Sequence, residues 1–337
     1  MAKALRNENY ILKTLHAMSL GYFITFVMGT IFKQIGYTFH MQEFVSWATI
    51  FIYLTGPAIG VSIGYVLQAK GMNLVCAIIA GAIGSGSFVV TQGHISLVTA
   101  NPIGAYISTI IVVEIVSLIE DKTPFDILLI PTIVLLCSGL VDQFILPYIH
   151  QLFVWMGHFI NHGMNMQPLL MSIVIAFAMG ILTTSPLTAF IVASMLDFSD
   201  LAAGAMLAGC CSHMIGLAIM SLEDNSITDV LAVGLGTSML QFKNIIKKPI
   251  LIVAPIISSV ITGMLSVVVF RIKCTSFNAS LGSMGLVGIL DAINQSHQLL
   301  AVILVNIVVP IVICWSMQRA FKKLNYMKNG DMKLTHL

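Results

Sequence analysis

Uncharged apolar segments of about 20 residues follow one another along almost the whole chain, and they constrain its fold more than any other feature. One of them, Leu201 to Leu222, contains no Asp, Glu, Lys or Arg. A helix needs about 20 apolar residues to cross the roughly 30 Å hydrocarbon layer of a bilayer. Only 9% of the residues are charged, whereas soluble domains carry about a quarter. The sequence therefore predicts a polytopic membrane protein.

The expected fold class is all-α. Lipid offers the backbone no hydrogen-bond partners, so a spanning segment must be a helix or part of a closed barrel. The long apolar runs lack the two-residue alternation of a barrel strand. We predict ten membrane segments, at about 15–35, 44–68, 72–91, 102–119, 125–147, 168–196, 201–222, 230–243, 249–270 and 298–319.

The apolar segments and the polar residues between them predict five regions. Residues 148–166 are rich in aromatic residues and histidines and indicate an interfacial amphipathic helix. His158 and His162 stand four residues apart, as in some metal sites, but Trp155 and Phe159 lie between them and favour the interfacial interpretation. The regions are a cytoplasmic N-terminal tail (1–14), a first group of transmembrane helices (15–147), the interfacial helix (148–166), a second group with re-entrant segments (168–319) and a basic cytoplasmic tail (320–337).

Basic residues fix the predicted orientation. Most of them fall inside if both termini are cytoplasmic, whereas the acidic segment 223–229 falls outside. The lysines of 243–249 are an expected membrane anchor, and they could also face a phosphorylated partner. The first residues are polar and basic and show no small-residue cleavage site, so we expect no cleaved signal peptide.

Two predicted helices are interrupted by polar residues. Thr184, Ser185 and Pro186 lie in the middle of 168–196, where proline kinks or ends a helix. Val233 to Gln241 interrupts 230–243, which is too short to cross upright and indicates a re-entrant loop or a half-helix. Irregular backbone at membrane depth needs protein or a water-filled cavity as its partner. The two interruptions therefore predict a polar cavity like those in which transporters bind substrates.

Residues 209–216, GCCSHMIG, place polar groups inside an apolar run. Vicinal cysteines do not match the Cys-x-x-Cys redox pattern, and no further zinc ligands lie at suitable spacing. Packing of small residues against another helix and a polar patch facing a cavity both remain open. His213 is the leading candidate ligand, because an ionisable group at membrane depth is costly.

Asn101 precedes Pro102 at the start of another predicted span, which also contains Glu114. Asn as the cap and Pro at the first position are typical of a helix start. The alternative is that the free amides of this helix start face oxygen atoms of a substrate. Glu114 is expected either to pair with a neighbouring helix or to accept hydrogen bonds from a sugar, and we favour pairing.

Several classes of protein have no support. The sequence contains no Walker loop, dinucleotide-binding pattern or Ser-His-Asp arrangement, and nothing indicates nucleic-acid binding. We assign no cofactor, metal ligand or catalytic residue. The predicted substrate-binding residues are Asn101, Glu114, Thr184, Ser185, His213, Thr237, Ser238, Gln241 and Asn244.

Five stretches together resemble a known family: NPIGAYI…VEI…DK (101–122), MGILTTSPLTA (179–189), LAAGAMLAGCCSHMIGLAIMS (201–221), GLGTSMLQFKNIIKKP (234–249) and GSMGLVGIL (282–290). They resemble the compact branch of enzyme IIC proteins, the sugar-specific membrane components of the bacterial phosphotransferase system, a branch that includes toxin-regulator-like members. The resemblance implies a homodimer in the bacterial plasma membrane, with a scaffold and a mobile elevator-type transport domain. It also implies that phosphate would come from a separate phosphorylated IIB protein.

These features predict a membrane permease for a sugar or another small polar solute. Neutral hydroxyl, amide and imidazole groups suit a polyol, because no net charge has to be desolvated. If a IIB protein acts, His213 or Glu114 is expected to position or deprotonate the attacking hydroxyl. The alternatives are a membrane sensor that binds a small molecule without transporting it, and an ion-coupled carrier.

Overall fold

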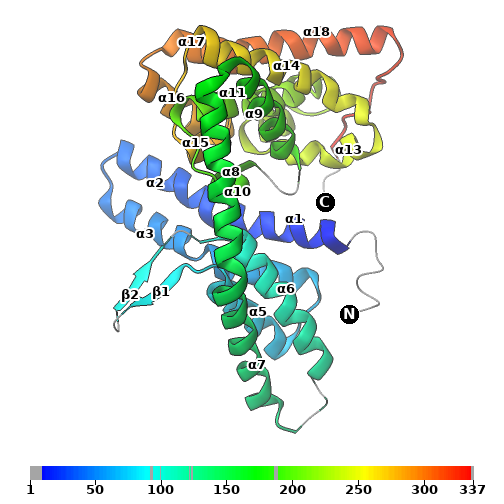
Figure 1. The fold of residues 1–337 in the computed structure, drawn as a ribbon. Coiled ribbons are helices and arrows are strands. Elements are labelled where there is room, and N and C mark those ends of the chain that lie inside the picture. The colour runs from blue at the N-terminus through cyan, green and yellow to red at the C-terminus, as the bar shows by residue number, and fades with distance from the viewer. Residues whose placement is uncertain are drawn as a thin grey trace. The chain divides into compact units, whose positions relative to one another are not determined.

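The computed structural model describes residues 10–91, 94–98, 100–120, 122, 124–185 and 189–334. It is helical apart from one small hairpin of strands (Figure 1). The chain divides into two compact units, Met1–Phe153 and Val154–Leu337, each with its own packed helices. The candidate site described below lies mostly in the second unit.

Helices of the first unit pack closely where small residues face each other. Gly60 of α4 lies against the backbone carbonyl of Ala77 in α5, where a side chain would not fit. A short π-helical turn, Phe23–Val27, joins α1 and α2 into one long apolar helix. The helices are α1 (Tyr10–Tyr22), α2 (Met28–Thr38), α3 (Gln42–Tyr53), α4 (Thr55–Val66), α5 (Gly71–Gly84), α6 (Pro102–Ile119) and α7 (Asp126–Leu140).

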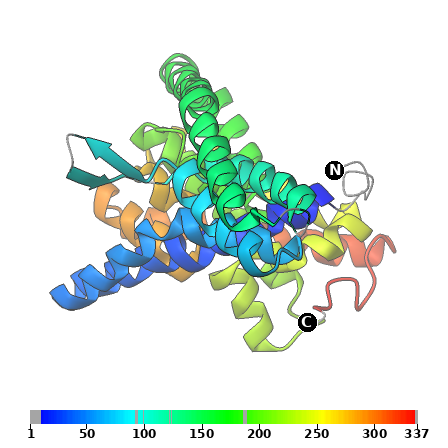
Figure 2. The same cartoon turned by 90° about the horizontal axis from the view of Figure 1, so that it is seen from below.

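A two-stranded hairpin follows α5 and was not expected from the sequence. Strands β1 (Phe88–Thr91) and β2 (His94–Leu97) pair antiparallel, and Figure 2 shows them standing clear of the helices of the first unit. Helix α5 ends at Gly84, so the predicted apolar span 72–91 is wrong in its last residues. Valine and isoleucine are apolar, but their branched side chains also favour strands.

Helix α11 (Asp200–Met220) is the centre of the second unit. Most of its side chains are fully buried, and it contacts α9 (Pro168–Thr184), α14 (Val253–Met264) and α18 (Val309–Lys323). A helix that is apolar and small-sided all round is expected in such a place. Helix α8 (Leu146–Met166) begins in the first unit and ends in the second. The other helices of the second unit are α10 (Ala189–Ala193), α12 (Ile227–Leu231), α13 (Phe242–Lys247), α15 (Ser276–Ser280), α16 (Val287–Ser296) and α17 (Leu299–Ile303).

Within the described residues, six helices are long and apolar enough to cross a membrane, or seven if the bent pair α3 and α4 forms one span. The chain is therefore an all-α, multi-pass membrane protein. Three predicted spans, 102–119, 201–222 and 249–270, agree with helices of the structure to within two residues; the total of ten remains a prediction. The six helices are Tyr10–Tyr37, Pro102–Ile119, Asp126–Met166, Asp200–Met220, Pro249–Val269 and Leu299–Lys323.

Residues 148–166 belong to a longer helix than the sequence indicated. A π-helical turn, Val141–Ile145, joins α7 to α8, and the helix runs from Asp126 to Met166. The interfacial position of 148–166 remains a prediction. At the N-terminus α1 begins at Tyr10, earlier than the expected residue 15, and residues 1–9 of the predicted tail lie outside the described residues.

Two charged segments that were predicted on opposite sides of the membrane lie against each other. Glu223 accepts a hydrogen bond from Lys322 at 2.5 Å, and Asp224 accepts one from the amide of Gly330 at 2.7 Å. Asn244 donates to the carbonyl of Lys333 at 3.1 Å. The predicted charge layout is therefore wrong here, because segment 223–225, the start of 243–249 and the tail share one end of the unit. Residues 227–247, called the folded-back segment below, leave this end and return to it.

Candidate functional site

His213 lies near the middle of α11 and is fully buried. Neither ring nitrogen has a hydrogen-bond partner among the described residues. The imidazole lies against Gly180 of α9, where even a methyl group would meet the ring. The imidazole therefore sits at the crossing of α9 and α11 with its hydrogen-bonding capacity unused.

Helix α9 ends close to this crossing, at the predicted interruption. Thr184 is its last residue, and Ser185 adopts an extended conformation. The hydroxyls of Thr184 and Ser185 donate to the carbonyls of Ile181 and Leu182, at 2.8 and 3.0 Å. Both hydroxyls thus donate hydrogen bonds to backbone carbonyls at the end of their own helix, as Ser and Thr often do. Residues 186–188, with the predicted Pro186, lie outside the described residues.

The second predicted interruption reaches the first. The backbone is extended at Thr237, whose hydroxyl accepts a hydrogen bond from the amide of Met239. The next side chain, Ser238, is fully buried and donates to the carbonyl of Thr183 at 3.1 Å. This bond supplies a partner to a carbonyl in the last turn of α9, which lacks a helical one. The two interruptions therefore meet in the second unit, as a polar site requires.

Thr183 connects this meeting point to α11. Its hydroxyl lies 3.0 Å from the Cys210 sulfur, one turn before His213. On α9, Thr183 follows Gly180 by one turn, and on α11, His213 follows Cys210 by one turn. The contact of Thr183 with Cys210 and the contact of Gly180 with His213 therefore belong to the same helix crossing. The prediction omitted Thr183 and Cys210. The sequence signal that could have added them to the predicted site is their spacing of one helical turn from Gly180 and His213.

Gln241 and Asn244 have different partners from those expected. Gln241 is fully buried, and its side chain donates to the carbonyl of Met332 at 3.0 Å. Asn244 donates to the Gln241 side chain at 2.8 Å and to the carbonyl of Lys333. Both amides are therefore engaged with the C-terminal residues in this structure.

Asn101 and Glu114 lie in the first unit, in α6. The Asn101 side chain accepts a hydrogen bond from the amide of Gly104 at 3.0 Å, with Pro102 at the first helical position, so the helix-start interpretation is confirmed. Glu114 accepts a hydrogen bond from the Tyr10 hydroxyl at 2.6 Å. This contact agrees with the favoured pairing role for the carboxylate.

The side chains at the crossing are neutral, and they are closely packed. Thr183, Thr184, Ser238 and His213 are at most 6% exposed. A separate pocket of about 200 Å³ opens beside the folded-back segment and is almost entirely apolar, and none of these four side chains lines it. The side chains at the crossing are therefore closely packed in this structure, and the polar cavity expected from the two interruptions remains a prediction.

Comparison with known proteins gives one match. The model of the family described as "Phosphotransferase system, EIIC" matches residues 12–334, nearly the whole chain. No curated protein and no solved structure matches. Among the described residues, no group of three His, Cys, Asp or Glu side chains is placed to hold a metal ion.

Proposed function

Because the chain belongs to the EIIC family of the phosphotransferase system, whose members are sugar-specific membrane permease components, we propose that it carries a sugar or sugar-like solute across the membrane. The family match extends over both units, so the proposal concerns the chain as a whole. The solute would bind at the crossing of α9 and α11, between the two interruptions.

The unpaired imidazole of His213 carries this proposal. A buried polar group without a partner costs about 1–3 kcal/mol, so a site that retains one is expected to gain its partner in another state. One sugar hydroxyl can donate to the unprotonated ring nitrogen, and a second can accept from the ring N–H. Thr183, Thr184 and Ser238 would complete a neutral set of hydroxyls around the same solute. No charge would have to be desolvated to admit it.

Transport would proceed by movement of the second unit. In this proposal the first unit is the scaffold, the second is the transport domain, and the folded-back segment is a re-entrant hairpin whose tip closes the site. The division of the chain into two compact units supports this assignment. We further propose that the protein is a homodimer in the bacterial plasma membrane, with both termini in the cytoplasm.

Phosphorylation would involve other proteins. EIIC proteins work with separate IIB and IIA proteins, and we propose that a phosphorylated IIB protein donates to the bound sugar. His213 is better placed than Glu114 to position the attacking hydroxyl, because Glu114 already accepts a hydrogen bond from Tyr10. Phosphoryl transfer depends mainly on such positioning and on charge stabilisation.

Uptake into membrane vesicles tests the proposal. Labelled neutral sugars are offered with and without a phosphorylated cytoplasmic extract, to the parent protein, His213→Leu and the exposed-histidine control His158→Leu. Saturable accumulation in the parent and the control, and its loss in His213→Leu, is the expected result. Binding without accumulation would instead indicate a sensor. Accumulation that follows an ion gradient and needs no extract would indicate an ion-coupled carrier.

A further inference from the structure

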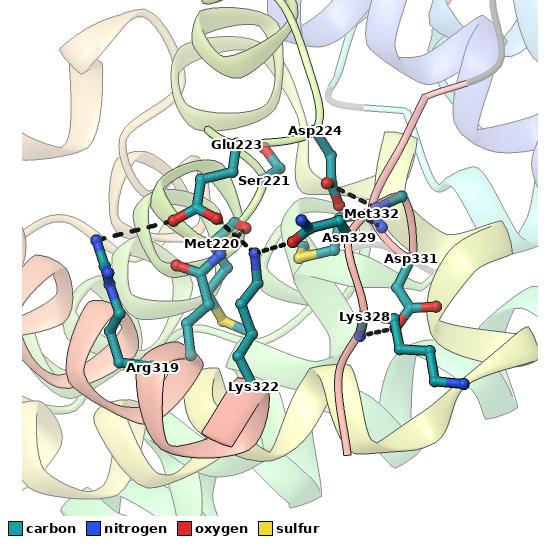
Figure 3. A network of polar contacts seen from close by, with 12 residues as sticks. Met220, Ser221, Glu223, Asp224, Arg319, Lys322, Lys328, Asn329, Asp331 and Met332 are labelled. Atoms are coloured by element: carbon teal, nitrogen blue, oxygen red, sulfur yellow. Dashed lines mark hydrogen bonds and ion pairs between the residues drawn. The ribbon is translucent and has the colours of Figure 1, made fainter. Parts of the chain in front are cut away.

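The C-terminal residues 326–334 form an ordered strap across one end of the second unit (Figure 3). The side chains of Met327 and Met332 are 2% and 0% exposed, so they anchor the strap in the apolar core. Between them the strap turns, and the backbone amide of Lys328 donates to the Asp331 carboxylate. The segment predicted as a basic cytoplasmic tail thus has specific tertiary contacts.

The strap is bound at the start of the folded-back segment by two adjacent side chains. Asp224 accepts hydrogen bonds from the amides of Gly330 and Met332, at 2.7 and 3.1 Å. Asn225 accepts one from the amide of Leu334 at 2.7 Å and donates to the carbonyl of Met332 at 2.8 Å. Four hydrogen bonds therefore hold the strap backbone to the residues just before 227.

The strap is bound at the other end of the folded-back segment as well. Gln241 also donates to the carbonyl of Met332, so that one carbonyl joins both ends of the segment. Asn244 donates to the carbonyl of Lys333, and Lys248 forms an ion pair with Asp331 at 2.5 Å. The strap is therefore a bridge between the point where the segment leaves and the point where it returns.

The folded-back segment consists of short helices and depends on contacts with other elements for its position. Its helices α12 and α13 have five and six residues, and helices this short are marginal without tertiary contacts. Several of its apolar side chains are exposed, among them Ile227 at 74%. Near its middle the segment is also held by the buried side chain of Val233 and by the Ser283 hydroxyl, which donates to the Gly234 carbonyl. The bridge formed by the strap is the contact that joins its two ends.

We propose that the strap is a releasable lock on the folded-back segment, and that Asp224, Asn225, Gln241 and Lys248 are the positioning residues that bind it. While the strap is bound, the two ends stay together and the segment covers the crossing of α9 and α11. Release of the strap frees the segment to move away from Thr183. The claim that release of the strap admits solute rests on the proposed function. The claim that the strap locks the segment does not rest on it.

Hydrogen exchange of the full-length protein in lipid nanodiscs tests the lock. The variants are Lys248→Gln, which removes the ion pair, and a chain that stops after Asn325. The matched control is Lys323→Gln, which removes the same charge from an exposed lysine of α18, outside the strap. We expect amides of 227–247 to exchange at least about tenfold faster in both test variants. In the control, the amides of 227–247 should exchange at the same rate as in the parent protein. The amides of α9 and α11 should exchange at the parent rate in every variant.

Two results would overturn the lock. The first is that the amides of 227–247 exchange as slowly in the chain that stops after Asn325 as they do in the parent protein. The second is faster exchange throughout α11 as well, because the strap would then stabilise the whole unit rather than the segment. Sugar uptake is measured on the same proteins. If the parent takes up no sugar, the proposed function fails, while the exchange rates still decide whether the strap locks the segment.

Discussion

The crossing of α9 and α11 depends on Gly209, and a single methyl group tests how tightly it is built. A β-carbon on Gly209 would lie 2.7 Å from the Cα of Ala176 and would also meet its carbonyl oxygen, whereas ordinary contact begins at 3.4 Å. Both are backbone atoms that cannot rotate away. In Gly209→Ala the two helices must therefore move apart by more than half an ångström.

The expected cost follows from two opposing effects. Overpacking lowers the free energy of unfolding by about 1–3 kcal/mol. Replacing glycine by alanine inside a helix raises it by about 0.8–1 kcal/mol. We expect a net loss of about 1–2 kcal/mol, because neither backbone can give way. A domain of this size loses roughly 2–4 °C in melting temperature per kcal/mol.

Thermal unfolding in detergent measures the effect. Gly139→Ala is the matched control: it also lies inside a helix, α7, and no atom lies within 4 Å of the added methyl. We expect Gly209→Ala to melt several degrees below the parent, and Gly139→Ala to melt at or above it. A Gly209→Ala protein as stable as the control would refute the close approach of the two helices.

Three further predictions concern single side chains. Asn101→Ala removes the cap of α6 and should cost about 1 kcal/mol of unfolding free energy, whereas Asn101→Asp should keep most of it; equal melting of both would contradict the capping role. Ser283→Ala leaves the Gly234 carbonyl without the hydroxyl that donates to it and should cost about 1–3 kcal/mol in the same assay. The hydrogen bond and charge of Lys322, with Arg319 nearby, lower the pKa of Glu223 from 4.5. The small difference in stability between the parent and Glu223→Gln should therefore be present at neutral pH and disappear as the pH falls through this lowered pKa. A difference that grows on acidification would count against the pairing.

The sequence predicted the long apolar helices well and the short irregular segments less well. Spans 102–119, 201–222 and 249–270 agree with the structure because composition and length determine them, and the cap at Asn101 follows from a local pattern. The hairpin at 88–97 was missed, since Val and Ile count as apolar in either conformation. A Gln-Gly pair between two runs rich in branched residues was the available signal.

The sequence predicted several of the residues that the structure brings together at the crossing, and their role in binding substrate remains a prediction. His213, Thr184 and Ser238 were identified because polar residues inside apolar runs are conspicuous. The partners of Gln241 and Asn244 are carbonyls of Met332 and Lys333, about 90 residues away in the chain. No local pattern indicates such contacts, because any residue type carries a backbone carbonyl. For the same reason the strap could not be predicted.

Binding of neutral sugars to the parent and to His213→Leu is the measurement that tests the central claim most directly. Each protein is melted with and without a panel of neutral mono- and disaccharides. We expect at least one sugar to stabilise the parent, by about 2.7 kcal/mol at one hundred times its dissociation constant. His213→Leu should melt no lower than the parent, because it loses no hydrogen bond, and no sugar should stabilise it. Equal stabilisation of both proteins by the same sugar would show that the solute binds elsewhere.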